Sequence, residues 1–453
     1  MPLGRLTPPK GTRDFDAVQV FRRRYILDIL QRTYQKYGFL PLETPALEHL
    51  DTLMGKYGQE GDQLLYKVLN SGDFLADVEL NSHTSASVLP HIASKGLRYD
   101  LTVPLMRYVA TNSSQIAFPF RRYQIQPVWR ADRPQKGRYR EFWQCDIDVV
   151  GTESLLCEAE IISLIHEVLH RLKLSQFSIH INHRGVLRGL ATMLGAADQE
   201  TALCVALDKL DKVGKANVLT ELRNKGLSAV ALEQLDFIFA LPTAAEARWE
   251  VLTNRLQDIP VTTAALQDLR TIHDQVQAMG LGTAKMLLDP TLARGLSYYT
   301  GTVLEVKLQD STWGSIGGGG RYDHLTDVFG LPNVSGVGFS FGLDRLYATL
   351  ESLALFPAGI EQTTQVMLAP LDDASTPWAL KVLATLRTQD ICAILYPASA
   401  RLKKQLQYAD RCRIPFVGVI GEEECAAQTI ALKDMAAGTQ QPYTLDQLVD
   451  KLS

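Results

Sequence analysis

The spacing of apolar residues changes period along the N-terminal part of the chain. Across residues 21–37 apolar side chains recur every three to four positions, which predicts an amphipathic helix that ends at Gly38. Residues 121–132 and 140–151 instead alternate between apolar and polar side chains, and the segment 133–139 between them contains Pro and Gly. This pattern predicts two antiparallel strands joined by a long, basic loop.

The second half of the chain is first helical and then returns to strands. Residues 187–275 are rich in Ala, Leu and Lys at helical spacing, which predicts a helical insertion. Strand-like sequence follows at 296–308, and at 334–352 a strand of small residues runs into a helix. Beyond a Pro-containing linker at 355–364, short apolar strands alternate with helical stretches, so we expect a small α/β domain with a largely parallel sheet.

Length and composition narrow the class of protein. A chain of 453 residues favours two or three domains. Lys and Arg number 46 against 50 Asp and Glu, a formal net charge of -4, which argues against a polybasic nucleic-acid binder but leaves room for local basic patches. The six cysteines are scattered, the N-terminus has no signal-type apolar core, and no run approaches the roughly 18 apolar residues of a membrane span. We therefore expect a soluble, cytoplasmic protein with no membrane partner.

The run HEVLH at 166–170 matches the His-Glu-x-x-His zinc motif of metalloproteases. At about 100° per residue, the aliphatic side chains around it gather on one helix face and both histidines fall on the other, toward solvent. The longer metzincin pattern needs a glycine where the chain has Lys173 and a histidine where it has Gln176. We interpret the match as a coincidence on an exposed helix face and expect no bound zinc.

The strongest chemical signal is a group of arginines around the predicted strand pair, at Arg130, Arg133, Arg138 and Arg140. A solvated basic loop would explain the arginines of the connector. It does not explain Arg130 and Gln144 within the predicted strands, where an unpaired charge is costly unless a ligand answers it. Arginine gives planar, bidentate contacts to phosphates, so we expect an anionic substrate such as a triphosphate.

Three segments resemble the motifs of class II aminoacyl-tRNA synthetases. Residues 128–151 resemble motif 2, residues 334–346 resemble motif 3, and residues 37–49 resemble the weaker motif 1, with Pro45 at its proline. Within this class, the run Arg-Gly-Leu-x-Tyr-Tyr that begins at Arg294 is similar to a signature of histidyl-tRNA synthetases.

Two further segments, 8–15 and 97–110, look like the same family, so the resemblance covers essentially the whole chain. Asp100, where many bacterial members have Glu, and the run QCDID at 144–148 resemble the eukaryote-like branch. Ser297 stands where Asp is frequent, which leaves the packing beside the histidine pocket open.

The resemblance implies an α+β class II catalytic domain, in which helices flank an antiparallel sheet, with a helical insertion and a C-terminal α/β anticodon-binding domain. The domains expected from it are 1–186 (catalytic core with motifs 1 and 2), 187–275 (helical insertion), 276–355 (catalytic core with the histidine-specific segment and motif 3) and 363–453 (anticodon-binding domain). It also implies a homodimer, formed through motif 1.

The resemblance also implies roles for single residues. Arg130, Arg294 and Arg345 match arginines that bind ATP and act in catalysis. The residues expected to bind histidine are Asp100, Leu101, Thr102, Gln144, Asp148, Tyr298 and Tyr299, and the carboxylates among them suit the substrate ammonium. Those expected to contact tRNA are Gln135, Arg140, Arg401 and Lys403, although a solvated helix face is an equal alternative for Lys403. The glycine run 317–320 is interpreted as letting a strand approach the bound adenylate closely.

The expected activity is activation of L-histidine by ATP to histidyl-adenylate, followed by transfer of the histidyl group to tRNA(His), with AMP and diphosphate released. ATP is expected to enter with Mg²⁺, and no residue is expected to hold a metal ion. The alternative is a catalytically silent paralogue that acts as the regulatory subunit of ATP phosphoribosyltransferase. Such paralogues lack the anticodon-binding domain, whereas here residues 363–453 are present and the expected catalytic arginines are intact.

Overall fold

The computed structural model describes residues 6–76, 78, 84–135, 137–242, 244–281, 286–294, 298–309, 314–361, 364–398 and 400–453. The chain forms two compact units, which divide after Leu355. Ser297, whose effect on the histidine pocket the sequence leaves open, lies outside the described residues. Among the described residues, no helix is both long and apolar enough to cross a membrane.

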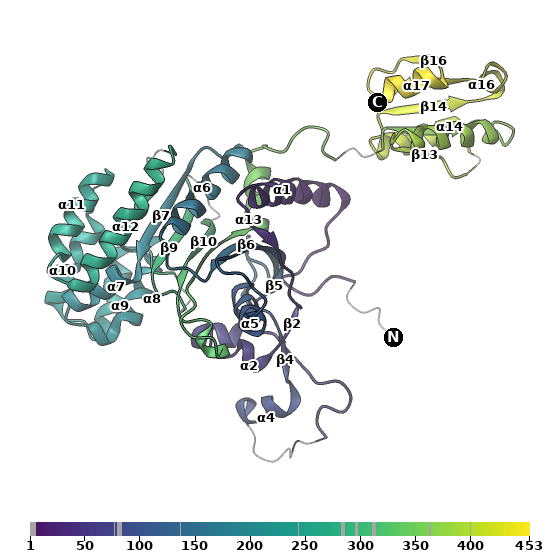
Figure 1. Cartoon of the computed structure of the whole chain (residues 1–453). Helices are drawn as coiled ribbons and strands as arrows, with labels where there is room; N and C mark the ends of the chain where they lie inside the picture. The colour runs from purple at the N-terminus through teal and green to yellow at the C-terminus, as the bar shows by residue number, and fades with distance from the viewer. Residues whose placement is uncertain are drawn as a thin grey trace. The chain divides into compact units, whose positions relative to one another are not determined.

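The first unit is built on an eight-stranded sheet (Figure 1). Across the sheet the strands are β1 (Leu40–Pro41), β5 (Phe120–Trp129), β6 (Glu141–Val150), β11 (Gly336–Gly342), β10 (Ser315–Tyr322), β9 (Thr302–Leu308), β7 (Phe177–His183) and β8 (Met286–Leu288). All pairs are antiparallel except the two outermost, β1 with β5 and β7 with β8, which are parallel. The antiparallel sheet expected of a class II catalytic domain is therefore present.

The strand pair predicted around the basic loop is β5 and β6, which pair in register from Phe120 with Val150 to Trp129 with Glu141. Arg130 was expected inside the first strand but lies one residue beyond it. Its backbone N–H still donates to the carbonyl of Arg140 at 2.9 Å, so one hydrogen bond continues the ladder into the loop.

One face of this sheet is covered by the helices α1 (Ala17–Lys36), α6 (Leu156–Arg171) and α13 (Leu343–Ser352). The helix predicted at 21–37 begins earlier because Asp16 caps it: its carboxylate accepts from the backbone of Gln19 at 2.8 Å and the Gln19 side chain accepts from the backbone of Asp16 at 3.1 Å. Gly38, with φ of +78°, follows its last turn as expected. The Tyr34 hydroxyl donates to the carbonyl of Cys145 at 3.0 Å, which ties α1 to β6.

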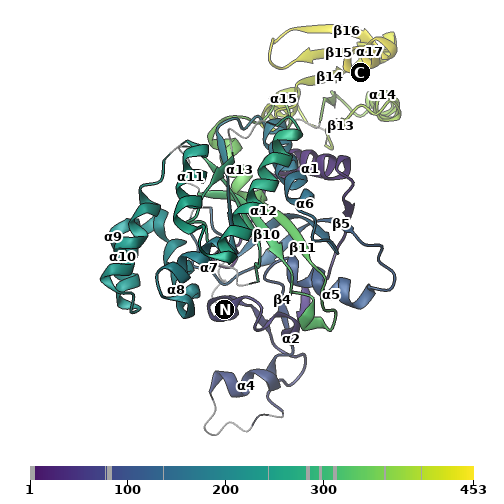
Figure 2. The same cartoon turned by 60° about the vertical axis from the view of Figure 1, so that its left-hand side comes forward.

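The N-terminal part of this unit also forms a small three-stranded sheet, in the order β2 (Leu47–His49), β4 (Lys95–Leu97) and β3 (Lys67–Val68). The helices near it in sequence are α2 (Leu50–Leu53), α3 (Gly58–Leu64), α4 (Ser85–Ile92) and α5 (Thr102–Asn112). Figures 1 and 2 show the segment with α4 extending away from the main sheet.

The helical insertion predicted at 187–275 consists of helices, and these extend slightly beyond it at both ends. They are α7 (Arg184–Met193), the 3₁₀ helix η1 (Ala197–Gln199), α8 (Glu200–Leu207), α9 (Leu210–Asn224), α10 (Ala229–Phe239), α11 (Ala245–Leu256) and α12 (Pro260–Ala278). Figure 1 shows them gathered beside β7, at the end of the sheet that β7 and β8 form. A second 3₁₀ helix, η2 (Asp327–Phe329), lies between β10 and β11.

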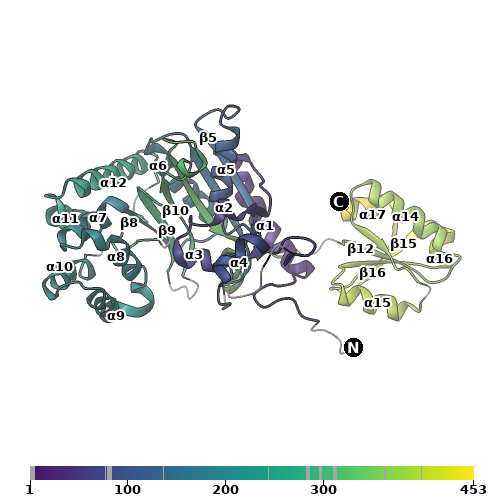
Figure 3. The same cartoon turned by 90° about the horizontal axis from the view of Figure 1, so that it is seen from below.

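The second unit has a five-stranded sheet in the order β13 (Ala393–Leu395), β12 (Val366–Pro370), β14 (Phe416–Ile420), β15 (Thr429–Asp434) and β16 (Gln440–Thr444), shown from below in Figure 3. Its helices are α14 (Thr376–Thr388), α15 (Leu402–Arg411), α16 (Glu422–Ala427) and α17 (Leu445–Leu452). The three strands that the sequence predicted are parallel, but β15 and β16 add two antiparallel pairings, so the sheet is mixed and not largely parallel.

Candidate active site

Four arginines from distant parts of the sequence approach one another on the sheet face that α1 and α13 leave uncovered. Arg130 and Arg138 come from the β5–β6 loop, Arg294 from the segment after β8, and Arg345 from the start of α13. Burial first, and then the positive charges of Arg138, Arg294 and Arg130, lower the pKa of Arg345. The fold therefore holds these cations close enough to lower the pKa of Arg345, and an anion between them would relieve the repulsion.

Two of the four arginines, Arg130 and Arg345, are positioned by backbone carbonyls. Nε of Arg130 donates to the carbonyl of Tyr99 at 3.0 Å, and its guanidinium stacks 4.2 Å from the centre of the Tyr99 ring. Nη1 of Arg345 donates to the carbonyl of Ser315. Carbonyl partners leave the positive charge uncompensated, so these side chains remain suited to phosphate.

Arg294 lies directly on the glycine strand β10. A Cβ added to Gly318 would stand 2.2 Å from its Nη1 and 2.5 Å from its Cζ, so only glycine leaves room for the guanidinium. Nη1 also lies 3.4 Å from Oε1 of Glu305. Burial acts to lower the pKa of Arg294, but Tyr299 and Glu305 outweigh it and raise the pKa. The glycine run was interpreted as room for an adenylate, and at Gly318 the structure fills that room with Arg294.

A pocket of buried carboxylates lies beside the arginines. Asp100 is 1% exposed; its Oδ1 accepts from the Tyr57 hydroxyl at 2.9 Å and its Oδ2 from the Tyr298 hydroxyl at 3.3 Å. Burial raises the pKa of Asp100, against these hydrogen bonds. Asp148 on β6 forms an ion pair with the fully buried Arg122, 2.9 Å between Oδ2 and Nη2.

Alternate residues of β6 present further polar groups on the same face as Asp148. The Gln144 amide donates to the Ser340 hydroxyl at 3.1 Å, while its Oε1 is buried with no hydrogen-bond partner among the described residues. Asp146, between them, is 3% exposed, and its Oδ1 is likewise without such a partner. Burial raises the pKa of both Asp146 and Asp148. Unpaired buried acceptors are costly, so this face is arranged for a ligand that brings hydrogen-bond donors.

Aromatic side chains close the pocket. The rings of Tyr298 and Tyr299 lie 4.8 Å apart, and Tyr298 meets Tyr322 edge-on at 6.2 Å. The Tyr322 hydroxyl donates to Oδ1 of Asp148. Of the two tyrosines of the predicted signature, Tyr298 thus contacts Asp100 directly, and Tyr299 packs beside Tyr298.

Residues 101 and 102 begin helix α5. Thr102 is 8% exposed and is its first residue. The Leu101 side chain is fully buried, and its carbonyl accepts from Arg122 at 3.2 Å. Leu101 therefore contributes its backbone to the site and not its side chain.

The residues predicted to contact tRNA have different surroundings. Gln135 is exposed and forms a two-residue bridge with Arg138 at the tip of the β5–β6 loop. Arg140 is occupied within the fold: its Nε donates to the carbonyl of Asp132 at 3.1 Å and its backbone N–H to the carbonyl of Gly11 at 2.8 Å. In the second unit, Arg401 and Lys403 are exposed at the start of α15.

Four site residues went unnoticed in the sequence: Arg122, Asp146, Tyr57 and Tyr322. The argument that singled out Arg130, a charge within a predicted strand, applies equally to Arg122, which lies eight positions earlier in the same alternating run. Tyr57 and Tyr322 carry no local signal, because their role depends on contacts with Asp100 and Asp148 across the fold.

The HEVLH run lies within α6. His170 is exposed, as predicted, but His166 is only half-exposed and packs edge-on against Phe177, with ring centres 5.8 Å apart. The glutamate between them, Glu167, accepts from Lys36 at 2.9 Å and from Arg171 at 2.8 Å. Among the described residues, no three His, Cys, Asp or Glu side chains form a group that could hold a metal ion.

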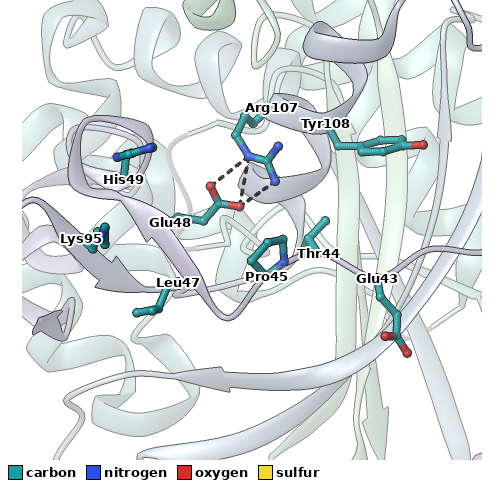
Figure 4. A pocket seen from close by; sticks show the side chains of 9 residues that line it. All are labelled: Glu43, Thr44, Pro45, Leu47, Glu48, His49, Lys95, Arg107 and Tyr108. Carbon is teal, nitrogen blue, oxygen red and sulfur yellow. Dashed lines mark hydrogen bonds and ion pairs between the residues drawn. The ribbon is translucent and has the colours of Figure 1, made fainter.

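A separate hollow lies in the segment predicted as motif 1 and includes none of the four arginines of the candidate site. Figure 4 shows Glu48 at its centre, held by Arg107 through hydrogen bonds of 2.9 to 3.1 Å. The residues that line it are Glu43, Thr44, Pro45, Leu47, Glu48, His49, Lys95, Arg107 and Tyr108. It shares no residue with the carboxylate pocket, so it is a feature of its own.

Comparison with known proteins identifies the family. Residues 93–346 match the family described as Histidyl-tRNA synthetase, and residues 365–453 match the one described as Anticodon binding domain. The histidine–tRNA ligase of Cytophaga hutchinsonii is 49% identical over 446 residues, 98% of each chain. The chain belongs to the histidyl-tRNA synthetase family. The crystal structure of histidyl-tRNA synthetase from Nostoc sp. PCC 7120 is 31% identical and superposes with a TM-score of 0.80, covering 99% of this chain and 98% of that one.

Family membership confirms the class II fold, including the C-terminal anticodon-binding domain. The expectation of a eukaryote-like member gains no support, because the similar curated proteins are bacterial. A structure from Bacillus halodurans described as an ATP phosphoribosyltransferase regulatory subunit/histidyl-tRNA synthetase has a TM-score of 0.72, 93% coverage of this chain and 99% of that chain. At 21% identity this similarity shows the shared fold alone, so the regulatory alternative is the less supported one.

Proposed function

We propose that this chain activates L-histidine with ATP and then transfers the histidyl group to tRNA(His). The observation that carries the proposal is the contact between two oppositely charged regions. Arginines converge where a triphosphate would lie, and buried carboxylates with a tyrosine wall adjoin them where an amino acid with a positive ammonium would lie.

In the first step, the carboxylate of histidine attacks the α-phosphorus of ATP and diphosphate leaves. This displacement needs no protein nucleophile, so positioning and stabilisation of the developing charge on the phosphate oxygens dominate. Arg130 and Arg294 would hold the α-phosphate and the substrate carboxylate, and Arg345 the far end of the triphosphate. ATP enters as its magnesium complex.

The histidine pocket would bind the substrate at both ends. Asp100, Thr102 and the β6 side chains Gln144 and Asp148 would accept from the ammonium, which satisfies the unpaired Gln144 oxygen. Tyr298 and Tyr299 would pack against the imidazole.

The second step needs tRNA. Gln135 and Arg140 would meet its acceptor end, with Arg140 acting through the loop that its internal contacts support. Arg401 and Lys403 would meet the anticodon region, which suits their exposure on the anticodon-binding domain. We also propose that the chain works in the cytoplasm as a homodimer, and the hollow around Glu48 suits the motif 1 contact between two copies.

The test is ATP–diphosphate exchange with each standard amino acid offered separately. Exchange that depends on histidine alone is expected if the pocket of Asp100, Gln144 and the two tyrosines is specific for histidine. Exchange with no amino acid, or with a different one, would contradict the assignment.

A second test removes the central guanidinium. Arg294→Ala is expected to reduce histidine-dependent exchange by at least about 10²-fold, the usual loss when one preorganised charge donor is removed. Arg133→Ala, at an exposed arginine of the β5–β6 loop, is the matched control and should keep normal exchange in the absence of tRNA. A near-normal rate for Arg294→Ala would refute its role.

A further inference from the structure

We infer that His180, Asn182 and Asp289 are positioning residues, which hold the segment that carries Arg294 in its working place. The inference rests on the function proposed above, since Arg294 matters only if a phosphate is bound beside it. None of the three side chains belongs to the arginine group or to the carboxylate pocket.

Arg294 requires support from outside its own segment. Its backbone lies in the left-handed region, with φ of +45°, a conformation that residues other than glycine adopt uncommonly. Its guanidinium also has to lie against Gly318 and beside Glu305 at the same time. Both requirements depend on where the segment 289–294 is attached.

The pairing of strands in the sheet places His180, to which the segment is attached, in line with the guanidinium of Arg294. His180 on β7 is the cross-strand partner of Glu305 on β9, and Glu305 is the partner of Gly318 on β10. Directly opposed residues of adjacent strands face the same side of a sheet. His180, Glu305 and Gly318 therefore form one row, and Arg294 lies on two members of it.

Asp289 binds His180, the member of this row that Arg294 does not contact. Its Oδ2 lies 2.8 Å from Nδ1 of His180, whose Nε2 lies 3.0 Å from the Ser178 hydroxyl. Its Oδ1 accepts from the Thr291 hydroxyl at 2.6 Å and from the Thr291 backbone at 3.1 Å. Ser178, His180 and Asp289 are connected like a hydrolytic triad. The additional bonds to Thr291 tie the carboxylate to the Arg294 segment and favour a positioning role.

Asn182 provides a second attachment on the same face of β7. The side chain is fully buried, and its amide donates to the carbonyl of Leu292 at 2.9 Å. Leu292 is two residues before Arg294, so the segment is held at its start through Asp289 and near its end through Asn182. Loss of either bond lets the guanidinium shift over Gly318.

The experiment measures histidine-dependent ATP–diphosphate exchange by the full-length protein and its variants. His180→Ala and Asn182→Ala are expected to lower kcat by about 10²-fold, the loss typical of a displacement of about 1 Å at a reacting group. The KM for histidine should change little, because Asp100 and Gln144 lie on other elements. His180→Asn, which keeps a donor near the position of Nδ1, should recover a large part of the rate.

The matched control is Asp268→Asn. Oδ2 of Asp268 on α12 lies 3.7 Å from Nε2 of His183, the last residue of β7, and loss of this second His–Asp pair should leave exchange normal. His183 faces the opposite side of the strand from His180, because successive side chains alternate. Circular dichroism and the thermal midpoint establish that each variant is folded.

A double-mutant cycle decides whether the effect passes through Arg294. Residues that act through one group are not additive, so His180→Ala should cause no further loss in an Arg294→Ala background. A multiplicative loss, or a normal kcat for both single variants, would overturn the inference. Wild-type protein with no histidine-dependent exchange would instead contradict the proposed function.

Discussion

The contact between Gly318 and Arg294 gives a prediction in which stability and activity separate. Alanine at 318 would place a methyl group 2.2 Å from Nη1, 2.5 Å from Cζ and 2.9 Å from Nη2 of Arg294. These atoms are the far end of a long side chain. The side chain can withdraw by rotation, whereas the backbone of β10 stays in its ladder with β9 and β11.

The required movement sets the magnitude. Carbon and nitrogen atoms in van der Waals contact lie about 3.5 Å apart, so the guanidinium must retreat by somewhat more than about 1 Å. A displacement of that size at a charge-stabilising group costs about 10²-fold in rate. The free energy of unfolding should change by less than about 1 kcal/mol, because alanine in a strand also replaces the entropically costly glycine.

The assay pairs histidine-dependent ATP–diphosphate exchange with urea unfolding. Gly342→Ala is the matched control: its methyl group would have Arg345 as its nearest neighbour, at an ordinary 3.9 Å, so both activity and stability should stay close to normal. Normal exchange in Gly318→Ala would refute the argument that β10 is glycine-rich in order to seat Arg294. If Gly318→Ala unfolds, the backbone of β10 moves more readily than the side chain of Arg294.

Three further predictions concern other parts of the unit. Arg122→Ala should destabilise the fold by about 3–5 kcal/mol in urea unfolding, because it leaves the carboxylate of Asp148 buried without its cation; a loss below about 1 kcal/mol would mean that Asp148 is protonated. His170→Ala should keep full exchange activity, and zinc chelators should have no effect while Mg²⁺ is in excess. Although burial opposes it, hydrogen bonds from His180 and Thr291 lower the pKa of Asp289 to about 2, below its value in the unfolded chain. The carboxylate therefore contributes about 2 kcal/mol above pH 4, and the difference in unfolding free energy between wild type and Asp289→Asn should shrink as pH falls from about 4 toward 2.

Strong periodicity made much of the fold predictable from the sequence. The β5–β6 pair, the helical insertion and the strand that runs into α13 all show sustained alternation or helical spacing. The strands β15 and β16 were missed because the segment 429–444 contains Lys, Asp, Gly and Pro, and its pairing is decided by the exposed edge of β14. β16 is the edge strand and most of its residues are exposed, so it carries little hydrophobic signal.

The site was predictable only where residues stand in a recognisable run. Arg130, Arg345 and the pair Tyr298 and Tyr299 were found in this way, and the structure brings them together. Arg122 was not found, although like Arg130 it is a charge within a predicted strand; its pairing with Asp148 on the next strand leaves no sign in the local sequence. Such pairs depend on register, which local sequence does not reveal.

Three glycines explain how one sheet face accommodates so many large polar side chains. A Cβ at Gly318 would meet Arg294 at 2.2 Å, one at Gly320 would meet the Tyr299 ring at 2.8 Å, and one at Gly338 would meet Oδ1 of Asp148 at 2.0 Å. Each glycine therefore lies beneath a different part of the proposed site: the phosphate region, the imidazole wall and the ammonium pocket. The space that a side chain at each glycine would occupy is filled instead by Arg294, Tyr299 or Asp148. Because a glycine has no side chain, Arg294, Tyr299 and Asp148 can lie close against the strands, and the two proposed substrates would bind over these groups.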